Sequence, residues 1–78
     1  MAMRAYAKKT FEDDFVVAYA FGPRPSEWVG EFVISHADPT DWHIFASSDR
    51  RLAEVTYMKG FRQFRESGEW PPGVSFNS

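Results

Sequence analysis

Apolar and polar side chains alternate through much of the first half of the chain, and this period of two predicts strands. Residues 3–11 alternate in this way and indicate a half-buried strand. Residues 15–21 are apolar on both faces and rich in aromatic and β-branched side chains, which is typical of a central strand. Residues 28–35 and 42–47 have the same character. The pattern therefore predicts four strands.

Three short segments interrupt this pattern and predict turns. Asp13-Asp14 separates the first two strands, and aspartate tolerates the backbone angles of tight turns. Residues 22–26 contain two prolines, which fix φ and remove backbone donors, so no strand continues there. Asp38-Pro39 predicts a type I turn before the fourth strand. Gly30, inside the third strand, indicates either a bulge or a close approach of two backbones.

The second half of the chain changes to a helical period. Ser48 is the predicted N-cap and Asp49 lies in the first turn, where its charge complements the helix dipole. The helix runs to about Ser67, because Gly68 suits the left-handed position after a helix. Gly60 predicts a close contact between helix and sheet. The side chains predicted to face the sheet are Leu52, Ala53, Thr56, Tyr57, Gly60, Phe61 and Phe64.

Four strands followed by a helix predict an α+β fold. We expect a two-layer sandwich in which a three- to four-stranded antiparallel sheet carries the C-terminal helix on one face, in the order β-β-β-β-α. Residues 1–78 form one domain, since 78 residues leave no room for two. Residues 69–78 either fold back over an open edge of the core or form a flexible tail. The sheet face opposite the helix is left apolar, as a homodimer or another protein partner would need.

Composition and charge narrow the possible functions. The chain has no cysteine, which excludes disulfides, a cysteine nucleophile and a thiolate zinc site. Fourteen Phe, Tyr and Trp residues provide an aromatic core. The net charge of −2 hides an asymmetry. Residues 11–41 contain seven acidic residues against Arg24 alone, a balance of −6, whereas residues 50–65 contain five basic residues against Glu54, a balance of +4.

The sequence contains no apolar stretch long enough to cross a bilayer and no signal-peptide pattern. We therefore expect a cytoplasmic protein with no membrane partner.

Two histidines and two aspartates lie within eight residues, at His36, Asp38, Asp41 and His43. Imidazole and carboxylate groups are ligands of divalent transition metals. If the flanking strands form a hairpin, His36 and His43 would lie nearly opposite each other and could hold a metal. The alternative is that the aspartates are ordinary turn residues and His43 belongs to the polar face of a strand.

A Ser-His-Asp relay can also be drawn from Ser35, Ser47 or Ser48 and these histidines. No glycine-framed nucleophile elbow is present, and Ser48 is explained as a helix cap. The prediction is therefore a protein that is not an enzyme and uses no cofactor.

The outer face of the helix carries a basic strip interrupted by apolar side chains. Its members are Arg51, Val55, Met58, Lys59, Arg62, Arg65 and Glu66. One interpretation is a surface for an acidic protein, and another is a surface for a nucleic-acid backbone. A third is a solvated helix face in which Glu66 pairs with Arg62. The overall acidity and the lack of nucleic-acid-binding motifs favour a protein partner.

The three tryptophans, Trp28, Trp42 and Trp70, are expected in the core or at its edge. Trp70 follows the helix cap and precedes Pro71-Pro72, so it could instead present an aromatic anchor to a partner. The predicted partner-binding residues are therefore Val55, Met58, Arg62, Arg65 and Trp70.

The pattern Trp28-x-Gly30-x-Phe32-x-Ile34-Ser35, followed by Phe45-x-Ser47 and a helix containing Gly60, resembles small uncharacterised bacterial proteins of this architecture. The resemblance covers about residues 15–67. It implies a bacterial or phage origin and no known activity. The function predicted from the residues is a non-catalytic binding or regulatory module that acts through protein contacts, with self-association as one form. Nucleic-acid binding by the helix and a metal-dependent activity at His36 and His43 stay open as alternatives.

Overall fold

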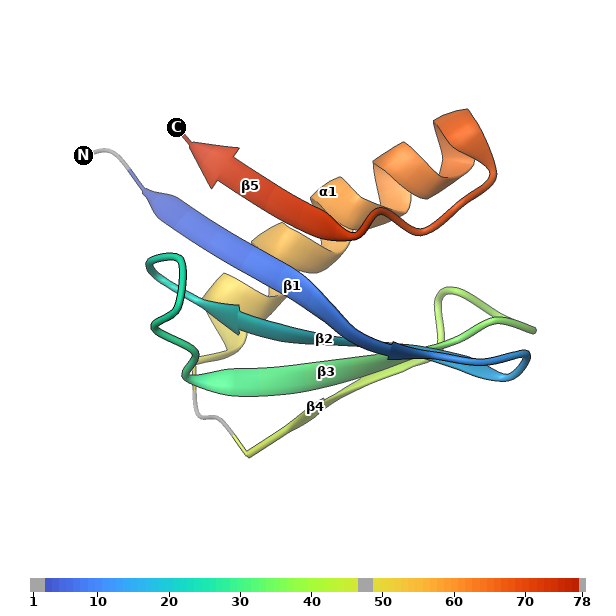
Figure 1. Ribbon diagram of the computed structural model, residues 1–78, viewed down its shortest axis with the longest axis horizontal. Coiled ribbons are helices and arrows are strands. Elements are labelled where there is room, and N and C mark those ends of the chain that lie inside the picture. Colours follow the sequence, from blue (N-terminus) through green and yellow to red (C-terminus); the bar gives the residue numbers. More distant parts are fainter. Residues whose placement is uncertain (1–2, 47–48, 78) are drawn as a thin grey trace.

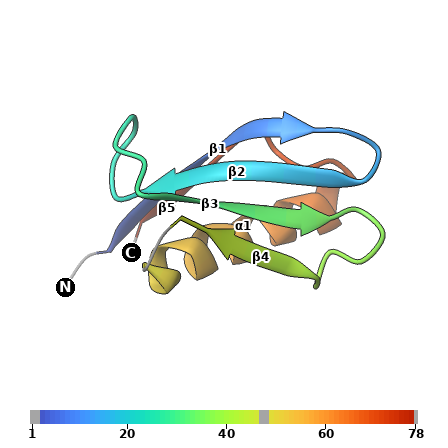
Figure 2. The same ribbon diagram turned by 90° about the horizontal axis from the view of Figure 1, so that it is seen from below.

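The computed structural model describes residues 3–46 and 49–77 and contains an antiparallel sheet with a helix on one face (Figures 1 and 2). Five strands lie in the order β4-β3-β2-β1-β5. In chain order the elements are β1 (Arg4–Glu12), β2 (Val16–Gly22), β3 (Gly30–Ser35), β4 (Trp42–Phe45), α1 (Arg50–Ser67) and β5 (Gly73–Asn77). The predicted α+β class is confirmed, but the sheet has one strand more than expected.

The turn between β1 and β2 forms where Asp13-Asp14 predicted it. The Asp13 N–H donates to the Val16 carbonyl over 3.0 Å. The Asp13 carboxylate accepts hydrogen bonds from the backbone N–H groups of Phe15 and Val16, each over 2.8 Å. Phe15 therefore lies in the turn rather than in the strand, and β2 begins at Val16.

No bulge forms at Gly30 in the β2–β3 pairing, which runs without a register shift up to Phe21 opposite Gly30. A bulge lies instead in β1, between Lys9 and Phe11. A close backbone approach occurs at Gly22, where a Cβ atom would lie 1.8 Å from the Glu27 carbonyl oxygen. Because the chain returns so tightly here, residues 28 and 29 lead into β3 rather than belonging to it.

Helix α1 spans 18 residues, and its N-cap is Asp49, whose carboxylate accepts from the Leu52 N–H over 3.2 Å. This corrects the assignment of Asp49 to the first turn, while the predicted cap Ser48 lies outside the described residues. Gly68 ends the helix as predicted, with a φ of 83° and an N–H that donates to the Phe64 carbonyl. Gly60 faces β5: a Cβ atom there would lie 3.3 Å from the Val74 side chain, which confirms the predicted close contact.

The segment after the helix folds back instead of forming a free tail. Gly73–Asn77 pairs antiparallel with β1, from Arg4 opposite Asn77 to Lys8 opposite Gly73. Its side chains alternate, with Val74 buried against the helix layer and Ser75 exposed. The order is therefore β-β-β-β-α-β, and β1 lies inside the sheet, so the predicted order β-β-β-β-α is wrong by its last element.

The core between sheet and helix is aromatic. Tyr19, Phe21 and Phe32 are nearly fully buried. The two buried tyrosines donate their hydroxyl groups to backbone carbonyls, Tyr19 to Pro71 and Tyr57 to Pro39, each over 2.5 Å. Burial, with a smaller contribution from Glu12, raises the pKa of Tyr19 well above its ordinary value. Both hydroxyls therefore stay neutral donors at physiological pH.

Within residues 3–46 and 49–77, no helix combines the length and the apolar character needed to cross a membrane.

Candidate functional site

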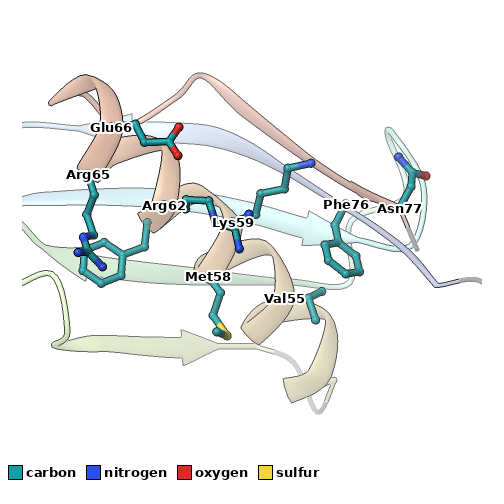
Figure 3. Close-up of a pocket in the computed structure, with 9 residues that line it drawn as sticks. Val55, Met58, Lys59, Arg62, Arg65, Glu66, Phe76 and Asn77 are labelled. Atoms are coloured by element: carbon teal, nitrogen blue, oxygen red, sulfur yellow. The ribbon is translucent and has the colours of Figure 1, made fainter.

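An open groove of about 720 Å³ runs along the outside of α1 (Figure 3). It combines one exposed stripe of the helix with the end of β5. Its lining residues are Val55, Met58, Lys59, Phe61, Arg62, Arg65, Glu66, Phe76 and Asn77. We call this surface the α1 groove.

The spacing of the helix residues explains why they share one surface. Residues three, four or seven positions apart fall on one side of a helix, and Val55, Met58, Arg62 and Arg65 follow that spacing. Four of the five predicted partner-binding residues therefore lie together. Phe76 also lines the groove, and the helical spacing alone does not indicate it because it lies on β5, a strand that was not predicted.

The floor of the α1 groove is apolar. Val55, Phe61 and Phe76 are partly buried and pack against the core. Met58, in contrast, is 67% exposed. Its side chain extends from the helix apart from those of Arg62 and Arg65 (Figure 3). An exposed methionine beside other apolar groups is the flexible kind of surface that adapts to irregular partners.

The cations of the groove differ in what they bind. Arg62 and Arg65 form no ion pair with any described residue, so the predicted pairing of Arg62 with Glu66 is absent there. The Arg65 guanidinium lies 5.9 Å from the centre of the Phe61 ring, a cation–π distance. The Lys59 ammonium group donates to the Ser75 carbonyl. Lysine thus covers part of the free edge of β5, while both arginines are available to a ligand.

Trp70 does not belong to this surface. Its side chain is 3% exposed and stacks on Phe64, with ring centres 4.6 Å apart. It also contacts Tyr19 edge-on. The prediction of Trp70 as a partner anchor is therefore wrong, because its ring packs against Tyr19 of the sheet and Phe61 and Phe64 of the helix. Of the three tryptophans, Trp28 is the most exposed, at 39%.

The His36 and His43 side chains are held apart. In the β3–β4 hairpin, His43 lies opposite Val33. The backbone N–H of His36 instead donates to the carbonyl of Phe15, the residue before β2. The His36 ring pairs with Glu12 over 3.0 Å, and the His43 ring pairs with Asp41 over 3.1 Å. The expected opposition of the two histidines is therefore wrong, because the β3–β4 register places Val33, three positions before His36, opposite His43.

The remaining predicted metal ligand, Asp38, stabilises a turn. Its carboxylate accepts from the backbone N–H of Thr40 over 3.1 Å and from the Thr40 hydroxyl over 2.7 Å. Across the described ranges, no group of three or more histidine or acidic side chains is placed to hold a metal ion. The Ser35 hydroxyl accepts from the Asp38 N–H over 3.4 Å, which is also a turn contact, and Ser47 and Ser48 lie outside the described residues.

The sheet face opposite the helix is mixed rather than uniformly apolar. Small side chains such as Ala18, Ala20 and Val33 occupy its centre. Lys8 and Glu31 pair with Ala20 from the two sides and interleave charge with these apolar groups. Two exposed phenylalanines, Phe11 opposite Ala18 and Phe45 opposite Glu31, lie on the same face, so it combines apolar and charged groups.

Comparisons of this chain with protein-family models, with curated proteins and with solved structures find no match. The resemblance to small bacterial proteins stays a prediction, and the functional argument depends on the geometry of the site.

Proposed function

We propose that this protein is a non-catalytic binding module whose α1 groove takes up a protein segment with an apolar anchor flanked by carboxylates. One observation carries the proposal: the exposed Met58 shares a groove with Arg62 and Arg65 and with partly buried apolar side chains, and neither arginine has an acidic partner among the described residues. The apolar floor would bury the anchor, and the two guanidinium groups would bind the carboxylates.

The same features favour a protein over a nucleic acid. Binding to a phosphate backbone depends on several cations and gains little from an apolar floor. In the groove, Lys59 already donates to Ser75, Glu66 adds a negative charge, and the whole chain carries −2. These observations support an acidic, amphipathic protein segment as the partner.

A fluorescent peptide of about 12 residues, with leucines at helical spacing and glutamates between them, tests this proposal. We expect the full chain to bind it and the same peptide with lysine in place of glutamate to bind at least tenfold more weakly. Met58→Ala and Arg62→Glu should each weaken binding about tenfold or more, since each removes a group from the centre of the contact. The measurement is fluorescence anisotropy at low ionic strength.

Arg51→Glu is the matched control, because it changes the net charge by the same amount on the same helix but outside the groove. It should leave binding within about twofold, as expected for a distant surface charge. Equal losses in Arg51→Glu and Arg62→Glu would overturn the proposal. So would the absence of peptide binding, or tighter binding to a 20-nucleotide oligo(dT) that falls steeply with salt.

A further inference from the structure

The turn between β1 and β2 is a second exposed apolar surface, and its charge is opposite to that of the α1 groove. Phe15 is 77% exposed and Phe11 is 53% exposed. Three acidic residues in sequence, at positions 12–14, lie between them. The turn lies at the same end of the sheet as the β3–β4 loop (Figures 1 and 2). We call residues 11–15 the acidic tip.

The acidic tip is held in one shape before any partner arrives. The Asp13 carboxylate accepts from the N–H groups of Phe15 and Val16, which fixes the backbone beside the exposed ring. Asp14, next to it, forms no hydrogen bond or ion pair with any described residue. A rigid anchor loses little conformational entropy on binding, so such a surface is prepared for a contact.

The acidic tip and the α1 groove of one molecule face different directions. Phe15 lines a shallow hollow with Val33 and His43, which lie on the helix-free face of the sheet. The groove runs along the outside of the helix on the opposite face. Since the sheet lies between the two surfaces, a contact between them requires two molecules.

We infer that the protein segment taken up by the α1 groove is the acidic tip of a second copy of this chain. The inference rests on the proposed function and names its partner. The tip offers an exposed apolar ring beside a carboxylate: Phe15 would pack on Met58 and the apolar floor, and the carboxylate of Asp14, the residue before it, would face Arg62 and Arg65. Every copy of the chain carries one acidic tip and one α1 groove, so the two surfaces are always present at equal concentrations.

Because the tip and the groove are different surfaces, the contact is head-to-tail. Such contacts leave one free tip and one free groove on a pair of molecules, and therefore continue into a chain or close into a ring. A symmetric pair through the helix-free face would instead stop at the dimer.

Sedimentation velocity of the full chain over a range of concentrations tests this assembly. The average mass should rise with concentration and should rise less at about 500 mM than at about 50 mM salt, because the contact pairs opposite charges. Phe15→Ser and Met58→Glu should each weaken association about thirtyfold, as the loss of a central anchor does. Both residues are exposed, so circular dichroism should show the fold unchanged.

Mixing the two variants gives the sharpest result. The Phe15→Ser chain keeps its groove and the Met58→Glu chain keeps its tip, so the mixture should form a one-to-one pair and no larger species. Phe45→Ser, which changes an exposed phenylalanine on the helix-free face, is the control and should assemble like the wild type. Loss of assembly in Phe45→Ser but not in Phe15→Ser would overturn the inference.

The assembly result separates this inference from the proposed function. If the chain stays monomeric at every concentration but binds the leucine–glutamate peptide through Met58 and Arg62, the second copy is the wrong partner and the binding module stands. If neither the peptide nor a second copy binds, both proposals fail.

Discussion

Asp13 stabilises the β1–β2 turn through its charge as well as its shape. The backbone N–H groups of Val16 and, next, Phe15 bond to its carboxylate and hold the pKa of Asp13 below the ordinary value of 3.8. The folded state therefore binds this proton less tightly than the unfolded state does. The resulting stabilisation is present above pH 3.8 and is lost as the pH falls through the lower folded-state pKa.

Asp13→Asn should show this dependence directly, since asparagine keeps an acceptor oxygen but does not titrate. The wild type should have the higher melting temperature at pH 7, and the difference between the two proteins should shrink steadily below about pH 4. Asp14→Asn is the control, because Asp14 bonds to no described backbone group. A difference for Asp13→Asn that is equally large at pH 7 and pH 2 would contradict the electrostatic account.

Trp70 is a core residue, and this predicts a large loss of stability when it is shortened. Trp70→Ala should lower the free energy of unfolding by about 3–5 kcal/mol, because it leaves a cavity beside Phe64 and Tyr19. Trp28→Ala, at a side chain that is 39% exposed, should cost about 1 kcal/mol or less. Urea unfolding followed by circular dichroism measures both. Similar losses for the two variants would disprove the assignment of Trp70 to the core.

At the scale of the element, the structure differs from the order of elements expected from the sequence by one strand, β5. Its five residues carry only two apolar side chains, Val74 and Phe76, between prolines and the chain end. So short an alternation predicts little by itself. The strand forms because β1 offers unpaired backbone groups along its free edge and because Gly60 leaves room for Val74.

Two neighbouring residues of β5 test whether the strand is part of the folded core. Val74→Asp would place a carboxylate at a position that is 5% exposed, and should lower the free energy of unfolding by about 3 kcal/mol or more. Ser75→Asp, one position along and exposed, should change it by about 0.5 kcal/mol or less. Denaturation midpoints give the comparison, and small effects at both positions would mean that the segment is a loose tail.

At the scale of the whole molecule, sheet and helix share one connected set of rings. Trp42 of β4 stacks on Tyr57 of the helix, with ring centres 4.2 Å apart, and Phe32 of β3 contacts both rings. Phe61 extends the contacts along α1 towards Trp70. Neither layer has an apolar core of its own, so we expect neither the sheet nor the helix to stay folded without the other.

This shared core predicts one cooperative unfolding transition. Tryptophan fluorescence, which reports the buried Trp70 and the partly buried Trp42 together with Trp28, and the helical signal in circular dichroism should give the same urea midpoint. A helix signal that survives after the fluorescence change is complete would show that the two layers unfold separately.

The fold also places acidic and basic residues on different surfaces of the molecule. Glu12 ends β1 and Asp13 and Asp14 lie in the turn that follows, while Arg62 and Arg65 lie on the outer face of the helix. The sequence indicates an acidic first half and a basic helix, but it does not show that each charge lies beside an exposed apolar group. That juxtaposition is the basis of both proposals.

The sequence by itself determined the elements whose signals are local. Alternation fixed the first four strands, the pair Asp13-Asp14 fixed a turn, and the helical period with Gly68 fixed the helix and its end. The period also brought Val55, Met58, Arg62 and Arg65 to one face. In each case the deciding contacts join residues only a few positions apart.

Only the tertiary structure decided what depends on residues far apart in the chain. Pairing with β1 made residues 73–77 a strand, and that strand added Phe76 to the groove. Contacts with Tyr19 of the sheet and Phe64 of the helix placed Trp70 in the core. The hairpin register kept His36 and His43 apart. Strand pairing and burial arise from contacts between distant segments, and a pattern read along one segment carries no information about which distant segment will cover it.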